Sequence, residues 1–359
     1  MGLDAVAAEA PPGKPPRVSG DRPPGRLVFT ADAAGSLFPL LPFSCIVQSV
    51  FRSALNLKIS TDPHLVSLIA DPRHAHPRGA VILGARFDEW TIERGSSGYF
   101  DGSRLSFADA DAPRVLVAPE RADADERAPA IARSPGLVAC LGRAAGLVAA
   151  ARAERGSRAI LVGTELGSTR AKGGTELAAG APAGTPLGTE LPLRDDFFTV
   201  CLRSAASDLA EAFSARSVEA ALGAAERMVG LGTGLTPSGD DFLCGFLAAR
   251  RSISAENGRG TRFLDSWGQS LAADGDRALS RTNEISAAFL ASAAAGRFST
   301  ALVTFGRAIA AEAEGRGDRM ALAAAVTALS FIGHGSGLDA AEGFLYGLQR
   351  GVEEHDDEA

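Results

Sequence analysis

The chain has 359 residues and a formal net charge of −7 at pH 7. A chain of this length can bury a large core and is expected to form two domains. The acidic balance, together with the lack of a basic stripe carrying aromatic residues, argues against nucleic acid as a main partner.

The cysteines and the apolar segments indicate the cellular compartment in which the protein is expected. Cys45, Cys140, Cys201 and Cys244 are scattered and form no CxxC pair, as expected of a reduced, cytoplasmic chain. No uninterrupted apolar run reaches the roughly 20 residues of a membrane span, and the N-terminus lacks the apolar stretch of a signal peptide. The sequence therefore predicts a cytoplasmic protein with no membrane partner.

The amino-acid pattern of the N-terminal part changes at about residue 27. Residues 1–26 are rich in Pro, Ala and Gly and are predicted to be a disordered tail. Residues 27–119 hold short strand-like runs separated by Gly, Pro and Asp, which predicts a small, mostly β domain. The runs are 65–69, 80–83, 90–92, 104–107 and 115–117. The segment 44–57 is favoured as a strand, with a helix as the alternative and Asn56 as a possible turn.

Three histidines of this domain raise the question of a metal site. His64, His74 and His76 lie in a Pro/Arg-rich stretch without a cysteine or carboxylate at ligand spacing. A solvated loop is therefore the favoured interpretation, and a metal cluster the alternative.

The middle of the chain connects the two expected domains. Residues 120–162 are predicted to hold a helix at 136–155 and a strand at 159–162. Residues 163–192 contain Gly-Thr-Glu-Leu three times among Gly, Ala and Pro. Because the spacing of these copies is irregular, the segment is predicted to be a flexible linker and not a structural repeat.

The C-terminal part shows helical periodicity. Apolar residues at i, i+3 and i+4 across residues 193–354 predict an all-α domain of about eight helices, followed by an acidic tail at 355–359. The predicted helices are 197–213, 218–229, the helix opened by Ser238, 263–271, 285–294, 300–311, 320–332 and the helix opened by Ser336. The predicted fold class is therefore α+β, with a mostly-β N-terminal domain before an all-α C-terminal domain.

Two glycine loops form an internal pseudo-repeat in the helical part. The first reads Gly230-Leu-Gly-Thr-Gly-Leu-Thr-Pro-Ser-Gly-Asp-Asp, and the second reads Gly333-His-Gly-Ser-Gly-Leu-Asp. Aligned on Ser238 and Ser336, 98 residues apart, both continue as Ser-Gly-x-Asp-x-x-x-Gly-Phe-Leu. The pattern predicts a unit that occurs twice, in which a glycine loop opens a helix.

Capping and packing alone would account for the shared positions. Ser238 with Asp241, and Ser336 with Asp339, have the spacing of a capping box. The glycine one turn further on in each helix, at 245 and 343, would permit a close helix crossing. These roles leave the additional loop glycines unexplained, because glycine loses much conformational entropy unless the backbone needs it.

The glycine loops also predict an anion site. Alternate glycines before a helix N-terminus present backbone N–H groups and a positive dipole to phosphate or carboxylate. The first loop matches neither the Walker motif nor the dinucleotide fingerprint. If a pseudo-twofold relates the two helices, their N-termini face one cleft, with residues 281–286 as a third wall. The predicted substrate-binding residues are Gly232, Thr233, Gly234, Thr236, Ser238, Gly239, Asp241, Thr282, Asn283, Gly335, Ser336, Gly337 and Asp339. Thr282 or Asn283 is alternatively a cap of the next helix.

Acidic side chains at the same helix ends would repel an anion. Asp241 and Asp339 are interpreted as caps neutralised by backbone N–H groups. Asp240 keeps three alternatives, as a Mg²⁺ ligand, a general base or a solvated carboxylate. His334 is either a proton shuttle near neutral pH or a helix-end histidine bonded to a carbonyl. Asp240 and His334 are therefore the candidate catalytic residues, and no nucleophile is predicted.

Residues 230–243, 281–286 and 333–339 together resemble the family that includes the H subunit of oxamate carbamoyltransferase. The resemblance extends over most of the chain from about residue 40. Gly335 departs from the usual Gly-His-Thr-Ser-Gly pattern and removes one hydroxyl.

The resemblance implies a subunit of a multi-component enzyme of allantoin breakdown, in purine catabolism. That enzyme moves the carbamoyl group of oxalurate to phosphate, giving oxamate and carbamoyl phosphate. It further implies a small anionic substrate, with a carboxylate or phosphate group, and other carbamoyltransferase subunits as partners. The alternative is a non-catalytic binding or scaffold subunit, which would dock a partner resembling an acyl-CoA synthetase.

Overall fold

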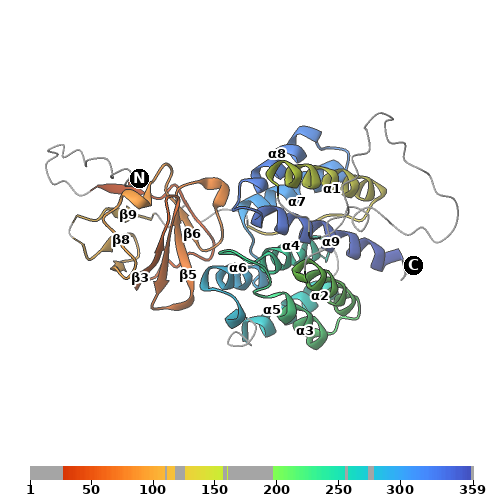
Figure 1. Ribbon diagram of the computed structural model, residues 1–359, viewed down its shortest axis with the longest axis horizontal. Helices are drawn as coiled ribbons and strands as arrows, with labels where there is room; N and C mark the ends of the chain where they lie inside the picture. The colour runs from red at the N-terminus through yellow and green to blue at the C-terminus, as the bar shows by residue number, and fades with distance from the viewer. Residues whose placement is uncertain are drawn as a thin grey trace, which may run out of the picture.

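The computed structural model describes residues 27–109, 111–117, 126–156, 160, 197–254, 258–273 and 279–356. A strand-rich N-terminal region precedes a helical C-terminal region, and the two lie side by side (Figure 1). The α+β class predicted from the sequence is confirmed.

One sheet forms the N-terminal region. Its nine strands in the described residues follow the order β1-β9-β8-β7-β3-β4-β5-β6-β2. The strands are β1 (Val28–Thr30), β2 (Ala33–Ala34), β3 (Phe43–Val50), β4 (Ala54–Ile59), β5 (Asp62–Ile69), β6 (Gly79–Val81), β7 (Ser97–Phe100), β8 (Arg104–Phe107) and β9 (Arg114–Leu116). Along the first half of β3, buried and exposed residues alternate, so every second side chain enters the core of the sheet region.

Two details of the predicted sheet are wrong. The predicted strand at 90–92 follows a short 3₁₀ turn, η2 (Phe87–Glu89), and the Trp90 N–H donates to the Phe87 carbonyl without pairing to a strand. The segment 44–57 is not one strand but most of the β3–β4 hairpin. Asn56 lies inside β4, where its side chain donates to Ser49 and accepts from Ser67.

The helical region contains α1 (Pro135–Arg155), α2 (Phe197–Ser214), α3 (Val218–Met228), α4 (Ser238–Ser254), α5 (Gly258–Ala273), α6 (Glu284–Ala294), α7 (Thr300–Ala313), α8 (Arg319–Ser330) and α9 (Ser336–Asp356). Helices α2 to α9 match the eight predicted helices. Helix α9 runs into the predicted acidic tail as far as Asp356. The predicted N-terminal tail and linker lie outside the described residues, as does the strand at 159–162 apart from Ile160.

Helix α1 joins the helical core although the sequence places it in a separate connecting segment. Leu137, Cys140, Ala144 and Val148 are buried in the same cluster as the other helices, and α1 packs against α7, α8 and α9. By length and composition alone, α1 is also apolar enough to cross a membrane, which the sequence reading did not recognise. In the structure this apolar face covers the helical core.

The two regions meet where β5 faces α6 (Figure 1). The Thr300 N–H at the start of α7 donates to the Ala75 carbonyl over 3.1 Å, and Lys58 of β4 pairs with Glu284 of α6. The ring of His76 lies edge-on against Phe289 of α6, with 4.8 Å between ring centroids. Backbone, ionic and aromatic contacts therefore all contribute to the interface.

Helices α4 and α9 cross at glycines. A Cβ atom on Gly245 would lie 1.9 Å from the Ala340 carbonyl oxygen, and a Cβ on Gly343 would lie 2.0 Å from the Phe242 carbonyl oxygen. The two contacts are exchanged by the 98-residue repeat, since Phe242 and Ala340 are equivalent positions. The predicted close crossing is confirmed, and the crossing sets how near the two glycine loops come.

The crossing predicts a large cost for one added methyl group. Gly343→Ala should lower the free energy of unfolding by about 3 kcal/mol, because the helices must separate to relieve a clash with backbone. The control is Gly142→Ala on the exposed face of α1, where a Cβ meets nothing within 4 Å. It should raise stability by about 0.5–1 kcal/mol. Urea unfolding compares the two, and equal stabilities would show that the crossing tolerates a side chain.

Candidate functional site

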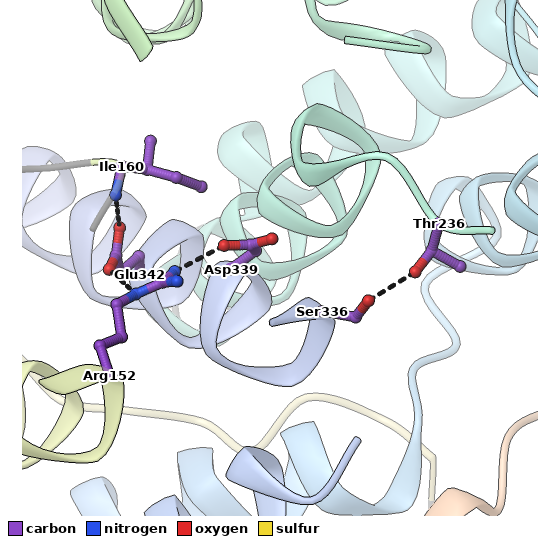
Figure 2. Close-up of polar contacts among 6 residues, drawn as sticks. All are labelled: Arg152, Ile160, Thr236, Ser336, Asp339 and Glu342. Carbon is purple, nitrogen blue, oxygen red and sulfur yellow. Dashed lines mark hydrogen bonds and ion pairs between the residues drawn. The ribbon is translucent and has the colours of Figure 1, made fainter. Parts of the chain in front are cut away.

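The two glycine loops meet at the N-termini of α4 and α9. Thr236 Oγ1 and Ser336 Oγ lie 2.6 Å apart, within hydrogen-bond distance (Figure 2). The hydroxyl of Ser336 also lies beside Asp241, and the hydroxyl of Ser238 lies beside Asp339. Each repeated serine therefore faces the acidic residue of the other copy, and the predicted approach of the two helix ends is confirmed.

Backbone conformation explains most of the loop glycines. Gly230, Gly232 and Gly234 have φ angles of 77°, 123° and 109°, and Gly333 has a φ of 59°. Residues with side chains rarely adopt this region, so glycine is required for conformation. Gly335 has no positive φ, and its departure from the family pattern is tolerated by the backbone.

The loops line a cavity of about 760 Å³, called here the loop cavity. Among the described residues, the backbone N–H groups of 232–236 and 333–335 donate no hydrogen bond. All of these residues line the loop cavity, and the positive ends of two helix dipoles adjoin it. Free N–H groups at helix N-termini are the arrangement that binds phosphate and carboxylate.

Asp339 is neutralised by an arginine and not by a helix cap. Arg152 Nη2 donates to Asp339 Oδ1 over 2.6 Å, and Arg152 Nε donates to Glu342 (Figure 2). The other oxygen of Glu342 accepts from the Ile160 N–H over 2.7 Å. Burial raises the pKa of Asp339, and Arg152 opposes this shift. The capping interpretation of Asp339 is wrong because α1 brings a stronger partner to the carboxylate.

Arg152 is a site residue that the sequence reading missed. It follows Leu141, Ala144 and Val148 at helical spacing on the buried face of α1. A charged residue at an apolar position of such a repeat rarely stays buried without a partner. That break in the pattern was the available signal.

Asp240 ties three segments together. Asp240 Oδ1 accepts from the Gly230 N–H over 2.8 Å, and Oδ2 accepts from the hydroxyls of Thr282 and Ser286 over 2.5 and 2.6 Å. The side chain is buried, so the solvated-carboxylate alternative is wrong. Asp240 lines neither cavity described here, and its contacts favour a role in positioning the first loop.

Asn283 supports the first loop from the same side. Its side-chain oxygen caps α6 by accepting from the N–H groups of Ile285 and Ser286, which confirms the capping alternative. Its amide donates to the Leu235 carbonyl over 2.7 Å. Thr282 and Asn283 therefore hold the loop from outside the cavities described here. Of the predicted third wall at 281–286, Ile285 lines one of these cavities.

A second cavity, called here the interface cavity, lies between the sheet and the helices. It has a volume of about 280 Å³ and a mostly apolar lining that includes Phe51, Ile69 and Phe289. Asp241 lines it, and Asp241 Oδ2 is shielded from solvent with no hydrogen-bond partner in the described structure. Thr236 and Ser336 line both cavities, so their hydrogen-bonded pair forms a shared wall.

The environment of Asp241 disfavours its charged form. Burial, followed by the charge of Asp339, raises the pKa of Asp241 well above its ordinary range, and the hydroxyls of Thr236 and Ser336 oppose the shift. Its Oδ2 has no cap interaction, so the predicted neutralisation by backbone N–H groups is not observed. Asp241 faces the junction of the two loops because α4 and α9 cross so closely.

The predicted site residues thus divide among three places. The loop cavity is lined by Gly232, Thr233, Gly234, Thr236, Ser238, His334, Gly335, Ser336 and Asp339. Asp241 and Gly337 line the interface cavity. Gly239, Asp240, Thr282 and Asn283 line neither. Gly239 serves packing, because a Cβ there would lie 2.1 Å from the Met228 carbonyl oxygen.

His334 is exposed at the loop cavity. Its side chain makes no hydrogen bond with any residue that the structure describes, so the carbonyl-bonded alternative is not observed. The side chain is therefore accessible to a ligand in the loop cavity.

The histidines of the sheet region do not form a solvated loop. His76 is buried beneath α6, and this burial, with Arg78 and His74 nearby, lowers its pKa to about 4. Within the described ranges, no three His, Cys, Asp or Glu side chains gather in a way that would hold a metal ion. Both oxygens of Asp240 already accept hydrogen bonds, so the geometry does not favour a metal at Asp240 either.

The raised pKa of Asp241 predicts how the stability of the protein depends on pH. Since its pKa is higher in the folded than in the unfolded state, the folded protein binds more protons, and stability falls as pH rises above about 4. Asp241→Asn should therefore become more stable relative to the parent between pH 4 and pH 8. Thermal unfolding across this range measures the difference, with the exposed Glu154→Gln as a charge-removal control. A variant destabilised equally at every pH would contradict the prediction.

Comparison with known families covers most of the chain. Residues 28–121 match the AllH family N-terminal domain, and residues 228–348 match the oxamate carbamoyltransferase subunit AllH. The first match spans the sheet, and the second spans both glycine loops and the α4–α9 crossing. No curated protein and no solved structure matches the chain. The chain belongs to the family of the oxamate carbamoyltransferase subunit AllH.

Proposed function

We propose that this chain is a subunit of a carbamoyltransferase and that its loop cavity binds the phosphate substrate. The reaction would move the carbamoyl group of oxalurate to phosphate, giving oxamate and carbamoyl phosphate, during allantoin and purine breakdown. Other subunits of the enzyme would be its partners. Its four cysteines are free, in keeping with a place in the reducing cytoplasm.

The observation that carries the proposal is the set of N–H groups in residues 232–236 and 333–335 that have no hydrogen-bond partner in the described structure. Phosphate oxygens accept several hydrogen bonds at once, and two helix N-termini favour a negative charge. The same N–H groups would stabilise charge that develops on the carbamoyl oxygen during transfer. Thr233 adds a hydroxyl donor along the same cavity.

The acidic residues of the loops are compatible with an anion. Asp339 is ion-paired with Arg152, and Asp240 accepts three hydrogen bonds on the far side of the first loop. The raised pKa of Asp241 reduces its negative charge. The repulsion that the sequence suggests is therefore weakened at each of the three positions.

The proposed chemistry balances without a further reactant. The bond between the carbamoyl carbon and the ureide nitrogen breaks, and a bond from that carbon to a phosphate oxygen forms. The proton of hydrogen phosphate passes to the nitrogen, which leaves as the amide of oxamate. We assign this transfer to His334, because an imidazole can both accept and donate a proton and His334 is open to the cavity.

The alternative function is a scaffold subunit without a ligand of its own. It is supported by the α4–α9 crossing, where Gly245 and Gly343 of the repeated motif have a full packing role. This alternative does not require free N–H groups at the loops, so ligand binding distinguishes the two.

Anion binding is tested with phosphate and carbamoyl phosphate on the purified chain, each with and without Mg²⁺. A ligand at one hundred times its Kd should add about 2.7 kcal/mol to the free energy of unfolding. Thr233→Glu, at an exposed position of the loop cavity, should weaken phosphate binding at least about tenfold through repulsion, or about 1.4 kcal/mol. The matched Thr233→Gln has the size of Glu without the charge and should bind phosphate more tightly than Thr233→Glu. Equal affinities of the two variants, or no stabilisation by either anion, would favour the scaffold.

His334→Ala tests the proton transfer in the enzyme assembled with its partner subunits. Because the side chain is exposed and unbonded within the described structure, the variant should keep the melting temperature of the parent. Loss of general acid–base catalysis should lower kcat by about 10²- to 10⁴-fold. Asp240→Asn is the contrasting variant, since loss of the charged acceptor should cost about 1–3 kcal/mol of stability. An unchanged kcat for His334→Ala would remove this residue from the mechanism.

A further inference from the structure

The interface cavity has an arginine and an aspartate that the proposed anion site does not use. Arg297 and Asp241 both line it, within a wall that is otherwise mostly apolar. The cavity is bordered by the sheet on one side and by helices α4, α6, α7, α8 and α9 on the other. Charged groups in such a wall are costly unless something pairs with them.

Arg297 is held at the cavity by the end of α6. Gly296 has a φ of 72°, and the Arg297 N–H donates to the Ser292 carbonyl over 2.9 Å, which closes the helix with a left-handed turn. The Arg297 side chain is half-buried and has no ion pair or hydrogen bond with any described residue. Arg152, by contrast, pairs with two carboxylates. A free guanidinium fork in a mostly apolar cavity suits a ligand carboxylate.

Asp241 presents the complementary group from the first turn of α4. Its Oδ2 is shielded from solvent and lacks a partner in the described structure. A carboxyl group pairs with an amide or ureide in either protonation state, because the amide offers both an N–H donor and a carbonyl acceptor. The cavity thus combines a site for a carboxylate with a site for an amide.

We propose that the interface cavity binds a small organic acid that carries an amide or ureide group, with the carboxylate at Arg297 and the amide edge at Asp241. The volume of about 280 Å³ suits a ligand of this size. The assignment of this ligand as the carbamoyl donor rests on the proposed function. In that role the organic acid and the phosphate occupy neighbouring cavities, and the hydroxyls of Thr236 and Ser336 lie on the wall between them.

Oxamate is the probe, because it carries one carboxylate and one primary amide. Calorimetric titration of the full chain should show oxamate binding, with oxalate at least tenfold weaker because it lacks the amide. Arg297→Gln should weaken oxamate at least tenfold and leave phosphate affinity unchanged. Arg94→Gln removes an equal charge from an exposed position outside both cavities and should bind oxamate normally.

Two further variants keep the test decisive. Asp241→Asn should reduce the preference for oxamate over oxalate, since the side-chain amide of Asn offers N–H donors to the second carboxylate of oxalate. Arg297→Lys keeps the positive charge but lacks the guanidinium fork, so it should bind oxamate with intermediate affinity. It replaces Arg297→Gln in the test if Arg297→Gln does not fold. Thermal unfolding of each variant establishes folding before titration.

The outcomes separate this inference from the proposed function. Oxamate binding that depends on Arg297, without any phosphate binding, would support the interface site and overturn the loop site. Phosphate binding that is weakened by Thr233→Glu, without any oxamate binding, would support the loop site and overturn the interface site. Oxamate affinity unaffected by Arg297→Gln and Arg297→Lys would overturn the inference.

Discussion

The close backbone contact between α4 and α9 is the constraint on which the site depends. Gly245 and Gly343 let each helix approach a carbonyl of the other, and no larger residue fits without separating them. The two helices open with equivalent glycine loops, so this contact brings Thr236 and Ser336 within hydrogen-bond distance. The same pair of glycines therefore permits the close packing of the core and sets the shape of the candidate site.

Around this crossing, the structure balances each acidic residue in a different way. Asp339 has Arg152 of α1, Asp240 has three hydrogen-bond donors, and Asp241 has a raised pKa. The pseudo-symmetry of the sequence is thus broken in the environment of the side chains. One acidic residue of the repeated pair is ion-paired, while its equivalent lies beside two hydroxyls and has one oxygen without a hydrogen-bond partner in the described structure. Under the proposed function, this difference would let the two loops serve different parts of one reaction.

The joint between the sheet and the helices gives the N-terminal region a place in the site. Residues of β4 and β5, together with His76, complete a cavity whose other walls come from the helices. Both regions contribute residues to its lining. This arrangement offers a physical reason for the two matched family segments to occur in one chain.

The sequence alone determined the fold class, the helices and the repeated glycine loops, because periodicity and glycine conformation are local properties. It also pointed to the close crossing through Gly245 and Gly343. It mistook Asp339 for a helix cap, and it passed over Arg152 and Arg297. Only the tertiary structure decided those roles, since Arg152 meets Asp339 from a helix far away in the sequence and Arg297 shares a cavity with strands of the sheet. Local spacing describes which backbone groups a side chain can reach, whereas the partner of a buried charge depends on which distant elements pack beside it.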